Sequence, residues 1–102
     1  MGKSRKILTE SGDLMELTEI RKEINKVNDE MLKLFEKRMA LCKEVALYKK
    51  ENNMEIFVKS REDEILKEIK EKSSKGLESY NEEFFKTLMA LSRDYQKTVT
   101  EE

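Results

Sequence analysis

Arg38 and Lys49 are two cations on one face of a predicted helix, and their spacing suits the binding of an anion. They are eleven residues apart in the sequence, or about three helical turns, so their side chains project from nearly the same face about 16 Å apart. Arg38 also interrupts an apolar series that resumes at Leu41 and Val45. Because an unpaired guanidinium in an apolar seam costs several kcal/mol, we expect a small anion to meet Arg38 and Lys49.

Other polar residues are spaced so that they could complete such a site. Arg21 precedes Arg38 by seventeen residues and points about 100° away from it, so one chain cannot easily aim both at one ligand, whereas a symmetric partner chain could deliver Arg21 to its neighbour's pocket. Ser92 and Gln96 are one helical turn apart and share a face, and Arg61-Glu62 follows the predicted start of another helix. Each residue alone is usually a solvated side chain, so the hypothesis of a site rests on the whole set.

The composition excludes several kinds of chemistry. The chain has no histidine, which excludes a histidine-ligated zinc hydrolase and a serine/histidine triad. Cys42 is the only cysteine and is expected to fill space in the core. The 21 basic and 22 acidic residues alternate, so we expect no nucleic-acid partner. No apolar run is long enough for a signal peptide or a membrane span, which predicts a cytoplasmic protein without a membrane partner.

The elements that would position these residues are helices. The chain has no proline, and nothing in the sequence breaks a helix between Asp13 and Asn52. Apolar periodicity predicts an all-α chain with helices from about 14 to 51, from about 60 to 72 with Ser60 as the cap, and from a capping box at 79–82 to about 98. Residues 1–12 are predicted to be a flexible N-terminal tail, and residues 13–102 to be the helical domain.

The first predicted helix is too long for the core of a single chain. It would extend about 57 Å, whereas a compact domain of this size has a radius of gyration of about 13 Å. With 37% hydrophobic and 42% charged residues, the chain has little apolar material to cover it. The apolar stripe of this helix is therefore expected to pair with the same stripe of a second copy in an intertwined homodimer.

Together, the polar residues and the predicted helices resemble the all-helical chorismate mutase family. The resemblance spans about residues 14–96 and rests on four segments, which are Leu17 to Arg21, Lys37-Arg38 to Lys49, Arg61-Glu62, and Leu91-Ser92 to Gln96. Val58 departs from the family pattern, which commonly has an aspartate there. At Val58 the resemblance therefore implies only a backbone N–H contact with the ligand.

The resemblance implies conversion of chorismate to prephenate in phenylalanine and tyrosine biosynthesis. This rearrangement breaks an ether C–O bond as a C–C bond forms, and it requires no covalent or acid–base catalysis, no cofactor and no metal. The implied catalytic residues are Arg38, Lys49 and Gln96. Arg38 and Arg21 of the partner chain would hold the two substrate carboxylates, and Lys49 and Gln96 would donate to the ether oxygen.

Three further substrate-binding residues are implied by the resemblance. Glu62 would accept a hydrogen bond from the ring hydroxyl, and Ser92 would donate one to a carboxylate. Arg61 would add positive potential and help to order the loop before it.

Two other interpretations remain open from the sequence. An isochorismate pyruvate lyase would share this helical fold and a cationic pocket but would eliminate pyruvate. A non-catalytic dimerisation module would use Arg38 only to fix the register of the paired long helices.

Overall fold

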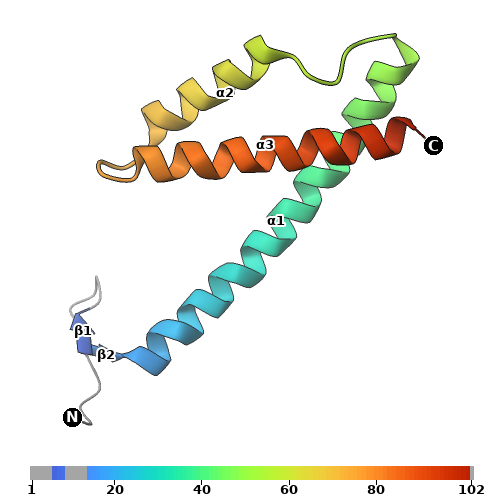
Figure 1. Cartoon of the computed structure of the whole chain (residues 1–102). Helices are drawn as coiled ribbons and strands as arrows, with labels where there is room; N and C mark the ends of the chain where they lie inside the picture. The colour runs from blue at the N-terminus through green and yellow to red at the C-terminus, as the bar shows by residue number, and fades with distance from the viewer. Residues whose placement is uncertain (1–5, 9–13, 102) are drawn as a thin grey trace. The chain divides into compact units, whose positions relative to one another are not determined.

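The computed structural model describes residues 6–8 and 14–101, in which two short strands precede three helices (Figure 1). The elements in chain order are β1 (Lys6–Leu8), β2 (Leu14–Glu16), α1 (Leu17–Glu51), α2 (Lys59–Lys72) and α3 (Glu78–Thr100). The predicted all-helical class, with three helices of which one is very long, is confirmed.

The two strands were not expected from the sequence. β1 and β2 pair antiparallel, with Ile7 opposite Met15. Strands of three residues are too short to show the alternating pattern that identifies a strand in a sequence. Residues 1–5 and 9–12 of the predicted flexible tail lie outside the described residues, so the flexibility of the tail stays a prediction.

Helix α1 is continuous over 35 residues and begins at Leu17, three residues later than predicted, because 14–16 belong to β2. It ends where Asn53 takes a left-handed conformation with φ of 53°. There the N–H of Met54 donates to the carbonyl of Lys49 and that of Asn53 to the carbonyl of Lys50. This pair of bonds is a Schellman ending, which satisfies carbonyls that the helix itself leaves without a donor.

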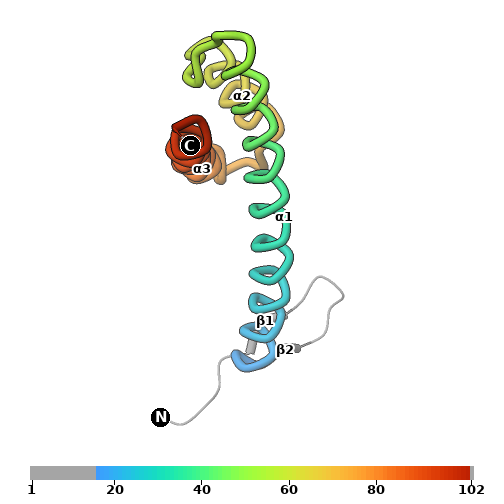
Figure 2. Tube along the Cα trace, turned by 90° about the vertical axis from the view of Figure 1, so that its right-hand side faces the viewer, coloured from blue at the N-terminus to red at the C-terminus, as the bar shows by residue number. Residues whose placement is uncertain are grey.

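The chain divides into two compact units, Met1–Lys37 and Arg38–Glu102. The second unit contains the last part of α1 together with α2 and α3. Helices α2 and α3 run side by side in roughly opposite directions, and the view in Figure 2 looks almost along α3. Gly76, with φ of 91°, lies in the turn that joins them.

The buried core is small, as its composition predicts. Among the described residues, the buried apolar side chains are Ala46, Leu88, Met89 and Val99. Ser92 and Gln96 are buried beside them. A core with two polar members out of six side chains points to a site within it, because buried polar groups are costly unless they have a partner.

In the first unit, the apolar stripe of α1 is exposed. Of its six members Ile20 is half-buried, and the other five are between 45% and 64% exposed, namely Leu17, Ile24, Val27, Met31 and Leu34. Exposed apolar patches of this extent are typical of interaction surfaces. Within residues 6–8 and 14–101, no helix combines the length and the apolarity needed to cross a bilayer.

Two predicted helix caps are wrong. Val58 is the N-cap of α2 and Leu77 that of α3, and neither makes a side-chain capping bond. Ser60 and the predicted capping box therefore lie inside helices that begin one or more residues earlier. At α3 the Glu78 carboxylate instead accepts the backbone N–H of Gly76, so an acidic side chain closes the turn.

Candidate active site

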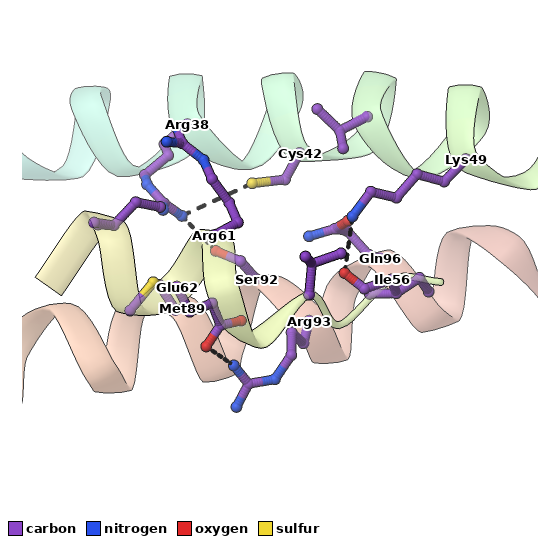
Figure 3. A pocket seen from close by; sticks show the side chains of 13 residues that line it. Arg38, Cys42, Lys49, Ile56, Arg61, Glu62, Met89, Ser92, Arg93 and Gln96 are labelled. Atoms are coloured by element: carbon purple, nitrogen blue, oxygen red, sulfur yellow. Dashed lines mark hydrogen bonds and ion pairs between the residues drawn. The ribbon is translucent and has the colours of Figure 1, made fainter. Parts of the chain in front are cut away.

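A cavity of about 130 Å³ lies in the second unit, between the end of α1, the start of α2 and the middle of α3 (Figure 3). Seven of the eight predicted site residues line it. Helix α1 contributes Arg38 and Lys49, and α3 contributes Ser92 and Gln96. The other three come from α2 and its N-cap, and they are Val58, Arg61 and Glu62. These residues come from three segments of the sequence, and the fold brings them to one cavity.

Arg38 is held in place by Ser92. Its Nη1 donates to Ser92 Oγ at 2.5 Å and lies 3.8 Å from the sulfur of Cys42. The Ser92 hydroxyl donates its own hydrogen to the carbonyl of Leu88 at 2.8 Å, which leaves an oxygen lone pair for Arg38. The guanidinium has further N–H groups, so Arg38 can bind a carboxylate without losing its contact with Ser92.

Lys49 and Gln96 approach the same end of the cavity from α1 and α3 (Figure 3). Lys49 Nζ donates to the backbone carbonyl of Ile56 at 2.9 Å and has two more hydrogens to donate. Gln96 is buried, and its Oε1 has no hydrogen-bond partner among the described residues. A buried polar atom without a partner costs about 1–3 kcal/mol, so a polar ligand that bonded this amide would recover that cost.

The start of α2 forms the third wall. The carbonyl of Val58 accepts the backbone N–H groups of Arg61 at 3.1 Å and Glu62 at 3.2 Å, which fixes the first turn of the helix. The side chain of Arg61 is exposed and donates to Glu64 Oε1 at 2.8 Å. Arg61 thus contributes charge at the edge of the cavity.

Arg93 also lines the cavity, although sequence reasoning missed it. Its Nη1 donates to Glu62 Oε1, and its guanidinium carbon lies 4.9 Å from the centre of the Phe57 ring. The signal was present in the spacing, because Arg93 is four residues after Met89 and three before Gln96 and so shares their face of α3.

The charges around the cavity are mostly positive. Of the described residues that line it, four are cations, namely Arg38, Lys49, Arg61 and Arg93, and one is a carboxylate, Glu62. This excess suits an anionic ligand. Among the described residues, no group of three or more Cys, Asp or Glu side chains is arranged to hold a metal ion.

Arg21 belongs to the first unit, where its side chain is exposed. Its predicted role in a site completed by a partner chain stays a prediction.

A comparison with protein families gives one decisive match. The family described as chorismate mutase type II matches residues 20–97, about three quarters of the chain. The chain belongs to the type II chorismate mutase family. The match contains the whole cavity and Arg21, so residues 20–97 form a chorismate mutase domain.

A curated relative agrees with this family assignment. The chain is 41% identical over 54 residues to the bifunctional chorismate mutase/prephenate dehydratase of Aquifex aeolicus (strain VF5). The matched segment is 53% of this chain and 15% of that larger protein, so the chain corresponds to a small part of the relative's length. Among solved structures, none gave a significant match.

Proposed function

We propose that this protein converts chorismate to prephenate and acts in the cytoplasm in phenylalanine and tyrosine biosynthesis. One observation carries the proposal. The fold brings Arg38, Lys49, Ser92 and Gln96, which are far apart in the sequence, to one cavity inside the matched domain. Chorismate is a dianion, and a cavity with an excess of cations suits it.

The proposed mechanism consists of positioning and electrostatic stabilisation. Arg38 holds one substrate carboxylate with the N–H groups that Ser92 does not use, and the hydroxyl of Ser92 supports this contact. Holding the flexible dianion in its folded shape removes much of the entropy cost of reaching the transition state. The rearrangement is unimolecular and needs no proton transfer, which is compatible with a chain that lacks histidine.

Lys49 and Gln96 would stabilise the charge that develops on the ether oxygen. Lys49 can keep its bond to the Ile56 carbonyl and donate to the substrate with another hydrogen. Rotation of the Gln96 amide exchanges its oxygen and nitrogen with little change of shape, so Nε2 can face the ether oxygen. Donors that meet charge appearing only in the transition state raise kcat rather than affinity alone.

The proposed enzyme is an intertwined homodimer in which Arg21 of one chain binds the second carboxylate in the other chain's cavity. Two observations support it. The apolar stripe of α1 is about half exposed, and the cavity of about 130 Å³ is small beside the roughly 300–1,000 Å³ of typical ligand pockets. A second copy would cover the stripe and add a further wall and a further cation to each cavity.

The direct test is incubation of the purified protein with chorismate and with isochorismate, while prephenate and pyruvate are measured. We expect prephenate from chorismate and little pyruvate from isochorismate. Release of pyruvate as the main reaction would assign the site to a lyase instead. If neither product forms and chorismate does not raise the melting temperature, the remaining interpretation is a non-catalytic dimerisation module.

A further inference from the structure

The Arg93–Glu62 ion pair joins α3 to the start of α2 and is well shielded from water. The two side chains are only 27% and 21% exposed. Ion pairs within a single helix are more open, as in Lys59–Asp63, whose side chains are 77% and 57% exposed. Exposed pairs contribute little because water and salt screen them, whereas a shielded pair interacts more strongly. The Arg93–Glu62 pair can therefore hold its two side chains in one arrangement.

Phe57 fixes the other side of the Arg93 side chain. The guanidinium carbon lies 4.9 Å from the centre of the Phe57 ring, a cation–π distance. Phe57 belongs to the loop that leads into α2. Arg93 is thus held between an aromatic ring and a carboxylate, and this double contact restricts the direction in which it presents its N–H groups.

The direction of Arg93 separates it from the residues proposed to bind the substrate carboxylates. Figure 3 shows its guanidinium turned toward Glu62 and away from Arg38 and Lys49. The bond occupies Glu62 Oε1, and a carboxylate has a second oxygen with lone pairs of its own. Oε2 is therefore able to accept a hydroxyl while Oε1 stays bound to Arg93.

We propose that Arg93 is a positioning residue that holds Glu62 so that its second oxygen accepts the ring hydroxyl of the substrate, an inference that rests on the function proposed above. Without Arg93, the Glu62 side chain would be free to rotate and would be attracted to Arg38 and Lys49. It would then neutralise cations that the substrate carboxylates need, and the ring hydroxyl would lose its partner.

The test measures kcat and KM for Arg93→Gln, Arg93→Lys, Glu62→Gln and the double variant Arg93→Gln/Glu62→Gln. Lys86→Ala is the matched control, because Lys86 is also on α3 and pairs with Glu82 and Glu83 outside the cavity. We expect Arg93→Gln to lower kcat/KM about tenfold to a hundredfold, the usual range for a hydrogen bond to a charged group. Arg93→Lys should retain part of the activity, and Lys86→Ala all of it.

The double variant shows whether Arg93 acts through Glu62. In the Glu62→Gln background, Arg93→Gln should cost less than about threefold, because the group that it positions is already altered. On a chorismate analogue without the ring hydroxyl, Arg93→Gln should likewise lower kcat/KM less than about threefold relative to the parent. A role confined to structural stability would lower activity equally on both substrates.

Several outcomes would overturn the inference. One is a full tenfold loss from Arg93→Gln in the Glu62→Gln background or on the analogue without the hydroxyl. Another is an active parent protein in which Arg93→Gln behaves like Lys86→Ala, which would remove this inference and leave the proposed function intact. An inactive parent would remove both. If Arg93→Gln does not fold by circular dichroism, Arg93→Lys on the two substrates decides the question, since equal losses on both would overturn the proposal.

Discussion

The two units of this chain share helix α1, but the buried side chains among the described residues all lie in the second unit. In Arg38–Glu102, the last part of α1 buries Ala46, and Arg38 is bonded to Ser92 of α3. In Met1–Lys37, most members of the apolar stripe of α1 are about half exposed, with Val27 at 54% and Leu34 at 64%. The second unit has a buried core. The stripe of the first unit consists of residue types that usually form a core, but most of them are not packed against other parts of this chain.

Apolar periodicity identifies a face of a helix without identifying the partner of that face. Intrachain packing buries Ala46 of α1 in the second unit, which also contains the cavity, but even there the apolar residues Leu41, Val45 and Tyr48 are between 46% and 61% exposed. Under the proposed function, the second unit would supply most of the chemistry, and the first unit would supply the dimer contact and Arg21. The following predictions test this division.

The largest effect is expected at the ether-oxygen donors of the second unit. Gln96→Ala or Lys49→Ala should lower kcat by about a hundredfold to a thousandfold, because each variant removes one donor to a developing negative charge. Circular dichroism should show a folded protein in both cases. Near-normal turnover in either variant would refute its catalytic role. Gln96 does not titrate, so this residue should cause no loss of activity between about pH 5 and 8.

A mixing experiment tests the assignment of Arg21 to the assembly. Arg21→Ala and Arg38→Ala should each be about a hundredfold less active or worse, since each leaves a substrate carboxylate without its charged partner. The two proteins are unfolded, mixed in equal amounts and refolded together. About a quarter of the parent activity should return, because about half of the dimers are mixed and each mixed dimer has one intact site of two.

Proteins that are refolded separately and then combined serve as the control for this mixing. If activity does not return, Arg21 acts within its own chain or not at all.

The exposed stripe of the first unit can be tested with a single charge. Val27→Asp should convert the proposed dimer to a monomer and destabilise it by about 3 kcal/mol or more, because an unpaired carboxylate would be buried in the proposed interface. Asn25→Asp is the matched control, since it adds the same charge two positions away, on nearly the opposite side of the helix. Sedimentation and thermal unfolding measure both effects. Equal behaviour of the two variants would show that this stripe is not an interface.

A smaller effect is expected at the turn between α2 and α3, within the second unit. Gly76 has φ of 91°, and a Cβ added there would meet nothing within 4 Å, so the cost of Gly76→Ala is conformational alone. We expect a loss of about 1 kcal/mol, or a melting temperature lower by about 4 to 8 °C. Ser74→Ala in the same turn is the control. An unchanged melting temperature in Gly76→Ala would mean that this turn tolerates another conformation.

The smallest effect concerns the exposed Glu78 at the start of α3. Its own backbone N–H and that of Gly76 hold the pKa of this carboxyl below its ordinary value of 4.5. A lowered pKa in the folded state stabilises the fold above pH 4.5, and this contribution is lost as the pH falls through the lowered value. The stability difference between the parent and Glu78→Gln should therefore be small at neutral pH and vanish in acid. Thermal unfolding between pH 3 and 7 measures it.

Helix content and most of the cavity were predictable from the sequence, because both depend on spacing along single helices. Arg38 and Lys49 on α1, and Ser92 and Gln96 on α3, keep their relative directions wherever the helices lie. Arg93 was missed because an arginine on a helix of a highly charged protein is usually solvated. Its role becomes visible only when α2 places Glu62 beside it.

Helix starts were the least predictable part of the fold. Ser60 and Ser79 have the right chemistry for caps, but α2 and α3 begin at Lys59 and Glu78. Local capping bonds contribute about 1 kcal/mol, so the path of the preceding turn can override them.

Helical structure, a helix too long for a single core, and the polar residues that share each helical face could all be read from the amino-acid sequence. These properties are local, because they depend on residue type and on the 3.6-residue period. The contacts of Arg38 with Ser92 and of Arg93 with Glu62 come from the packing of the helices, as does the burial of the Gln96 oxygen, which has no hydrogen-bond partner among residues 6–8 and 14–101. Contacts between helices depend on how separate segments pack, and the spacing within one segment has no information about that packing.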